Sequence, residues 1–184
     1  MNWPHFDIRI LDAPLGAEVI GFSLAHDRDD NNTDRLQSAL LDHHLLVFRG
    51  QQVTPRLQRD AGHRLAAQSL APHGEAALFS NLQMAYDTLT LGLRRLVHSA
   101  RVLQEGAAGA LPLVRLYPET GRRALVVPDP AATRVVGASD AESKELLQEL
   151  HAHATRPQHL YRHSWLPDDL LFWDQHSLMQ VAVD

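Results

Sequence analysis

Histidines that stand close to carboxylates are the residues of this chain most able to do chemistry. The chain has 12 His, 22 Asp and Glu residues and no Cys. A metal site would therefore use imidazole and carboxylate ligands, since neither a thiolate site nor a disulfide can form. Two His and one carboxylate are the ligand set of non-heme Fe(II) oxygenases. His-x-acid triplets occur at residues 5–7 and 73–75. Chance gives about 1.4 such triplets at this composition, so the triplets alone do not indicate an iron site.

Other histidines occur in pairs whose spacing can be compared with the period of a helix or a strand. His151 and His153 are two residues apart in a helical segment, so they do not share a face of that helix. His159 and His163 are four residues apart and could share one face of a strand. Packing or exposure is the more ordinary role for strand histidines of this kind, so the pair alone does not predict a metal site.

The elements that must position these residues are short strands interleaved with amphipathic helices. Asn32 or Thr33 is predicted to cap one helix and Thr54 a second. Ser139 and Glu142 form the capping-box pattern of a third helix. Strands are predicted from apolar runs and alternation at residues 6–11, 17–20, 45–48, 113–117, 124–127, 161–165, 170–173 and 178–183.

Composition limits the class of protein. A length of 184 residues predicts one domain, spanning residues 1–184, with a substantial buried core. The hydrophobic share of 45% and the charged share of 21% are ordinary for a globular protein. The formal net charge of −5 argues against a nucleic-acid partner. No apolar run reaches membrane-spanning length and the N-terminus lacks signal-peptide features, so no membrane association and a cytoplasmic location are expected.

The order of residues from Leu160 to the end, LYRHSWLPDDLLFWDQHSLMQVAVD, carries more information than its periodicity. It resembles the C-terminal part of the TauD/TfdA family of Fe(II)/2-oxoglutarate-dependent dioxygenases, whose pattern here is YRHRW-x-x-GDL-x-x-WDN-x-x-x-x-H. Three further segments look like family motifs in the same order: FRGQ at residues 48–51, VRLYPETGR at 114–122 and HATRP at 153–157.

This resemblance implies a fold, an activity and two cofactors. The fold class would be α+β, with a distorted double-stranded β-helix of the jelly-roll kind, flanked by helices and incomplete. The family hydroxylates small molecules and converts 2-oxoglutarate to succinate at an Fe(II) centre. Fe(II) and 2-oxoglutarate are therefore the cofactors that the resemblance implies.

The chain departs from the family pattern at the positions that would hold those cofactors. Gln180 stands where the family has its distal iron-binding His, and Ala77 stands at the Thr that assists cosubstrate binding. The family's WH-x-D segment has no counterpart, which predicts an internal deletion near residues 73–74. A missing C-terminal end would remove the cosubstrate Arg. The expected result is no intact catalytic, cofactor-binding or metal-ligating residue.

The sequence therefore predicts a truncated family member, catalytically impaired and doubtful as a binder of Fe(II) or 2-oxoglutarate. Two alternatives stay open: a non-catalytic binding or oligomerisation module, and the product of a decayed gene. An incomplete jelly roll leaves unpaired sheet edges, so self-association is expected.

Structural roles are predicted for several residues of the last motif. Trp165 and Trp173 are interpreted as core residues. Arg162 could contact an anion, but a structural ion pair is the favoured role. Asp168 replaces the turn Gly of the family, and Asp tolerates the left-handed conformation that this turn requires.

Overall fold

The computed structural model describes residues 6–27, 29–72, 76–104, 106, 108–118 and 120–182. The chain groups into two compact units. Unit 1 comprises Met1–Phe79 and Leu160–Asp184, and unit 2 comprises Ser80–His159. The single domain expected from the length stays a prediction, and so does the deletion near residues 73–74, because residues 73–75 lie outside the described part.

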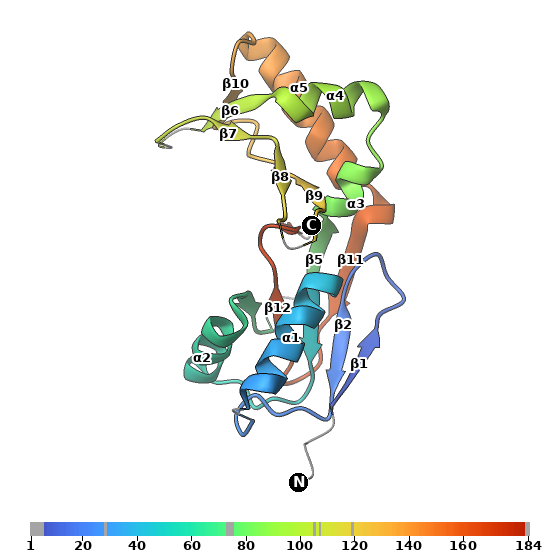
Figure 1. Cartoon of the computed structure of the whole chain (residues 1–184), viewed down its shortest axis with the longest axis vertical. Helices are drawn as coiled ribbons and strands as arrows, with labels where there is room; N and C mark the ends of the chain where they lie inside the picture. The colour runs from blue at the N-terminus through green and yellow to red at the C-terminus, as the bar shows by residue number, and fades with distance from the viewer. Residues whose placement is uncertain are drawn as a thin grey trace. The chain divides into compact units, whose positions relative to one another are not determined.

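Unit 1 is built on a five-stranded sheet in the order β1-β2-β3-β12-β4 and a three-stranded sheet in the order β11-β5-β13 (Figure 1). The strands β2 and β3 are parallel, and helix α1 makes the crossover between them. The elements of unit 1 are β1 (Asp7–Ile10), β2 (Ala17–Ile20), α1 (Asp30–His43), β3 (Leu45–Phe48), α2 (Pro55–Leu65), β4 (Gln68–Leu70), β5 (Ala76–Asn81), β11 (Leu160–Ser164), β12 (Leu170–Trp173) and β13 (Leu178–Val181).

The central strands β3 and β12 are buried on both faces, which explains their unbroken apolar sequence. Alternate side chains enter two different apolar clusters. Phe48 and Phe172 pack with the buried faces of α1 and α2, whereas Val47 and Trp173 pack with Phe79 of the three-stranded sheet. Unit 1 is therefore layered as helices, large sheet and small sheet, and the apolar runs predicted as strands 45–48 and 170–173 are confirmed.

Helix starts follow the capping chemistry of the sequence in two of three cases. Thr54 Oγ1 accepts a hydrogen bond from Leu57 N at 3.1 Å, and the Ser139 capping box is formed. The predicted cap of α1 at Asn32 or Thr33 is wrong. Asp29 caps this helix, because its Oδ1 accepts from Asn31 N at 2.8 Å and both predicted caps lie inside the helix.

Unit 2 combines a three-stranded sheet in the order β10-β6-β7 with a β8-β9 hairpin and three helices. Strands β6 and β10 were not predicted from the sequence, and Val102 is the one buried residue of β6. The elements of unit 2 are α3 (Leu82–Asp87), α4 (Leu91–Ser99), β6 (Arg101–Gln104), β7 (Leu111–Pro112), β8 (Val114–Leu116), β9 (Arg123–Leu125), β10 (Thr133–Val135), α5 (Asp140–Ala154) and the 3-10 turn η1 (Pro157–His159).

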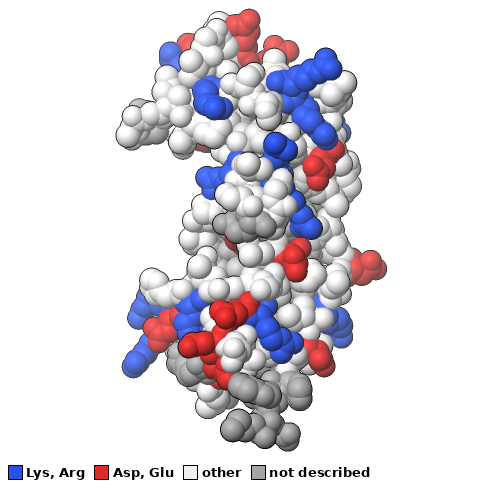
Figure 2. All heavy atoms as spheres, in the orientation of Figure 1, with Lys and Arg blue, Asp and Glu red and all other residues white. Residues whose placement is uncertain are grey.

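Surface charge and helix length are the features that concern the expected absence of nucleic-acid and membrane partners. On the face drawn in Figure 2, acidic and basic side chains are interspersed rather than gathered by sign. None of the helices in the described ranges has both the length and the apolar character needed to cross a bilayer. The expected absence of a nucleic-acid partner stays a prediction.

Candidate functional site

The two positions that should hold iron and cosubstrate lie on neighbouring strands of the small sheet. Ala77 of β5 is buried in the apolar cluster that contains Phe79 and Leu171. Gln180 of β13 is exposed, and residues two apart on a strand share a face, so it lies on the same strand face as the buried Leu178. Ala77 offers no polar atom, and the amide of Gln180 is a neutral group.

The described residues do not supply the ligand set that an Fe(II) oxygenase needs. No group of three His, Cys, Asp or Glu side chains within the described ranges lies close enough to hold one metal ion. His5 and residues 73–75, which form the two His-x-acid triplets, lie outside these ranges. A two-His, one-carboxylate site does not fit the donors present on β5 and β13.

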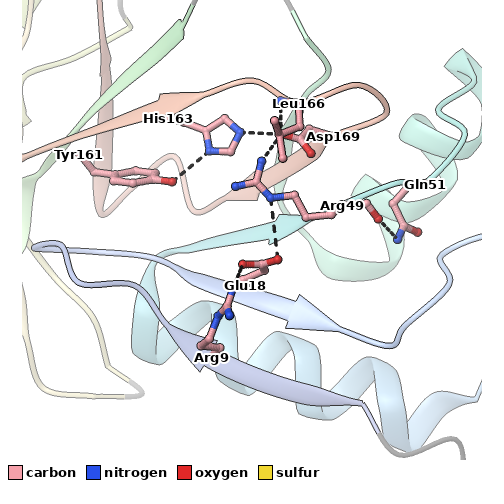
Figure 3. A network of polar contacts seen from close by, with 8 residues as sticks. All are labelled: Arg9, Glu18, Arg49, Gln51, Tyr161, His163, Leu166 and Asp169. Carbon is pink, nitrogen blue, oxygen red and sulfur yellow. Dashed lines mark hydrogen bonds and ion pairs between the residues drawn. The ribbon is translucent and has the colours of Figure 1, made fainter.

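A polar network around Asp169 is the main concentration of buried charge in unit 1 (Figure 3). Asp169 Oδ2 accepts hydrogen bonds from Leu166 N at 2.8 Å and from His163 Nε2 at 3.1 Å, and it forms an ion pair with Arg49 Nη1. The preceding turn places Asp168 at φ 60°, so the predicted left-handed Asp is confirmed. This turn aims the Asp169 carboxylate back at β11 and β3.

The network extends over three strands of unit 1, β1, β2 and β11. Tyr161 Oη lies 3.0 Å from His163 Nδ1 on β11. Glu18 of β2 lies 3.8 Å from Arg49 Nε and also pairs with Arg9 of β1 (Figure 3). Residues that the sequence placed in two separate motifs, FRGQ and YRH-x-W, therefore meet at one carboxylate.

The hydrogen-bond partners of His163 determine which of its ring nitrogens carries the proton. A carboxylate oxygen only accepts, so His163 carries its proton on Nε2, and its Nδ1 accepts from the Tyr161 hydroxyl. Burial lowers the pKa of His163, and the nearby Arg49 lowers it further, whereas the bond to Asp169 opposes both. Burial raises the pKa of Tyr161. The His163 ring is thus bonded at both nitrogens and links β11 to the turn that precedes β12.

Three interpretations of the last motif can be compared with the structure. Trp173 is buried, as predicted, and Trp165 is half-buried, with its ring 4.7 Å from the ring of His163. The ion pair expected for Arg162 stays a prediction, since this exposed side chain has no ion-pair partner among the described residues. Arg49, from the other motif, makes the buried ion pair instead.

The expectation that His159 and His163 could share a strand face is wrong. His163 lies on β11, whereas His159 ends the 3-10 turn η1 of unit 2. There the ring of His159 lies 5.1 Å from that of His153, and both approach the hydroxyl of Thr88. Sequence reasoning missed this cluster, because Thr88 is far away in the chain and carries no motif signal.

The sequence of this chain matches a known protein family over more than half of its length. The sequence profile described as "Taurine catabolism dioxygenase TauD, TfdA family" matches residues 65–179, which is more than half of the chain. The chain belongs to this family. The Fe(II)/2-oxoglutarate-dependent dioxygenase family inferred from the motifs is thereby confirmed.

Individual TauD/TfdA relatives give the extent of the similarity. The (S)-phenoxypropionate/alpha-ketoglutarate-dioxygenase of Sphingobium herbicidovorans is 28% identical over 259 residues, which covers 97% of this chain and 90% of the relative. The pentalenolactone F synthase of Streptomyces arenae is 30% identical over 132 residues, and the chain spans only 44% of its length.

A solved structure supports the same assignment at the level of the fold. The crystal structure of a taurine dioxygenase from Burkholderia xenovorans superposes with a TM-score of 0.81 and 25% identity, over 97% of this chain and 82% of that chain. The predicted mixture of helices and sheets with a TauD-like architecture is confirmed.

Proposed function

We propose that this chain is a TauD/TfdA-family scaffold that does not by itself assemble an Fe(II)/2-oxoglutarate site, and that it therefore does not hydroxylate a substrate on its own. The observation that carries the proposal is the pair Ala77 and Gln180, one apolar and one a neutral amide, at the expected cosubstrate and iron positions. The absence of a three-ligand group among the described residues supports it.

The length of the alignment to the Sphingobium relative supports the proposed internal deletion. That alignment extends over 259 residues, whereas this chain has only 184. The relative therefore carries segments without a counterpart here. A deletion near residues 73–74 would remove such a segment, with the WH-x-D ligands that the family resemblance places there.

Anaerobic titration with Fe(II) and 2-oxoglutarate tests this proposal. We expect no metal-to-ligand charge-transfer band and, after exposure to O2, no succinate above a metal-free blank. A full-length family dioxygenase treated identically should give both signals, and circular dichroism should show that the chain used is folded. Either signal from this chain would overturn the proposal.

A sheet edge that has no partner strand in the described part of the chain favours a second candidate function, self-association as an oligomerisation module. In the five-stranded sheet β1 is an end strand, and Ile10 on it is 67% exposed. Ile20 on the adjacent β2 is 40% exposed. Exposed edge strands with apolar side chains pair readily with another chain. A second copy of this chain, adding its own β1 edge to edge, is the partner that we propose.

Light scattering tests the association. We expect species heavier than the 20.6 kDa of one chain at micromolar concentration. Ile10→Lys should shift the population toward monomer, because it places a charge on the edge. Leu91→Lys makes the same change on α4 at a position 66% exposed and should leave the mass distribution unchanged. A monodisperse monomer for the unaltered chain would contradict the proposal.

A further inference from the structure

Two buried histidines of unit 2 meet at one hydroxyl group. His153, on the last turn of α5, is 5% exposed, and His159, in η1, is fully buried. Thr88, which follows α3, places its Oγ1 2.9 Å from His159 Nε2 and 3.2 Å from His153 Nε2. These contacts join α3, α5 and η1 through three side chains.

The protons of this cluster can be assigned from the backbone carbonyls around it. His159 Nδ1 lies 2.9 Å from His153 O, and a carbonyl only accepts, so the proton of this ring is on Nδ1. His153 Nε2 lies 2.9 Å from Ala85 O, so the proton of that ring is on Nε2. The two rings therefore hold opposite tautomers, and His159 Nε2 accepts from the Thr88 hydroxyl.

Thr88 has a second acceptor for its proton. Its Oγ1 also lies 2.9 Å from Met84 O, in the last turn of α3. A hydroxyl group has one proton, and it rotates to suit its neighbours. Its oxygen can therefore accept from His159 Nε2 while its proton goes to Met84 O, with each group still bonded.

We propose that His153, Thr88 and His159 form a one-proton switch. When a proton from solvent binds His159 Nε2, the Thr88 hydroxyl rotates from that nitrogen to Met84 O. The new N–H donates to Thr88 Oγ1 and the rotated hydroxyl donates to Met84 O, so each group stays bonded while the cluster gains one proton and its charge. Thr88 itself is exposed, which gives the proton a route from the surface to the buried ring.

The cluster holds one proton rather than two. His153 Nε2 already carries the proton that it donates to Ala85 O, so a further proton on this ring would have to bind Nδ1. Two charged rings with centroids 5.1 Å apart would repel each other. The positive charge of protonated His159 therefore disfavours the binding of a second proton to His153.

The charged side chain that acts on His159 is Arg156, which follows α5. Asp87 at the end of α3 and Arg94 of α4 lie on neighbouring helices, where Arg94 donates to Asp87 O. Burial lowers the pKa of His159, and His153 and Arg156 lower it further, against the bond to His153 O. The unfolded chain therefore takes up this proton first. Stability contributed by neutral His159 is present above about pH 6.5 and declines as pH falls below it.

Imidazole nitrogen NMR across a pH titration tests the switch. At pH 7.5 we expect the Nδ1–H tautomer for His159 and the Nε2–H tautomer for His153. Thr88→Val removes the hydroxyl at nearly constant shape and should lower the proton affinity of His159 by about tenfold, because the protonated Nε2 then lacks an acceptor. Thr88→Ser keeps the hydroxyl and should titrate within about twofold of the unaltered chain.

The exposed His151 on the same helix is the internal reference in these spectra. An Nε2–H tautomer for His159 at pH 7.5 would overturn the proposal, and this measurement needs no variant. Equal proton affinities of His159 in the Thr88→Val and Thr88→Ser variants would also overturn the proposal. Protonation of both rings in the folded chain would show that the cluster is not limited to one proton.

Discussion

Asp169→Ala is expected to lower the free energy of unfolding by about 2–6 kcal/mol, because the buried His163 N–H and the Leu166 N–H lose their acceptor, each at a cost of about 1–3 kcal/mol. The Asp169 side chain is 1% exposed and receives Arg49, His163 and the backbone N–H of Leu166 on one oxygen. Arg49 keeps its contact with Glu18, whereas the other two donors lose their acceptor. Urea denaturation followed by tryptophan fluorescence measures the loss, since Trp165 and Trp173 both lie in unit 1.

The adjacent residue provides the matched control for this prediction. Asp168 is exposed and lies at φ 60°, a conformation that Asn tolerates as well as Asp. Asp168→Asn removes one carboxylate from the same turn and should change the free energy of unfolding by no more than about 0.5 kcal/mol. Equal effects of the two substitutions would show that the turn, rather than the buried carboxylate, supports the fold.

The polar network also shows how far the sequence could predict the site. Residues Arg49, His163 and Asp169 all lie in segments recognised as family motifs. Their convergence was not predictable, because Arg49 and Asp169 are 120 positions apart and meet only when β3 pairs with β12. The sequence favoured Arg162 as the ion-pair residue of the motif. Arg162 is exposed on β11, and among the described residues the buried carboxylate of Asp169 pairs with Arg49 instead.

The secondary structure was predictable where burial leaves a periodic or continuous apolar pattern. Strands β3 and β12 are buried on both faces, so their sequence is apolar throughout. Strand β6 buries only Val102, so no pattern distinguishes it from a loop. The helix caps show the same limit. Asp29, Asn32 and Thr33 are all residue types that can cap a helix, and α1 begins after Asp29, whose backbone N–H donates to Asp27 Oδ1.

The apolar core and the Asp169 network do not depend on a hydroxyl group at position 77 or on the side-chain amide of Gln180. Ala77 packs as an ordinary core residue, and Gln180 is exposed. A TauD/TfdA scaffold can therefore keep its layers and its strand pairing while the proposed ligand positions change. This separation makes the stability predictions independent of the proposed loss of iron binding, so a failure of one does not decide the other.

Phe172→Ala is expected to lower the free energy of unfolding by about 3–5 kcal/mol through the cavity that it leaves. Phe172 is fully buried on β12, and its ring meets that of Phe48 edge to face at a centroid distance of 5.5 Å. Phe48 in turn contacts Phe22 at 6.1 Å. Truncation would therefore remove one end of an aromatic row that joins the large sheet to the N-terminal segment.

Leu166→Ala is the control for this substitution, because Leu166 is 55% exposed just before the same strand. It should change the free energy of unfolding by no more than about 0.5 kcal/mol. Urea denaturation of both variants gives the comparison. A loss for Phe172→Ala no larger than that for Leu166→Ala would mean that β12 does not lie at the centre of unit 1, and the pairing that brings Arg49 to Asp169 would then lack its structural basis.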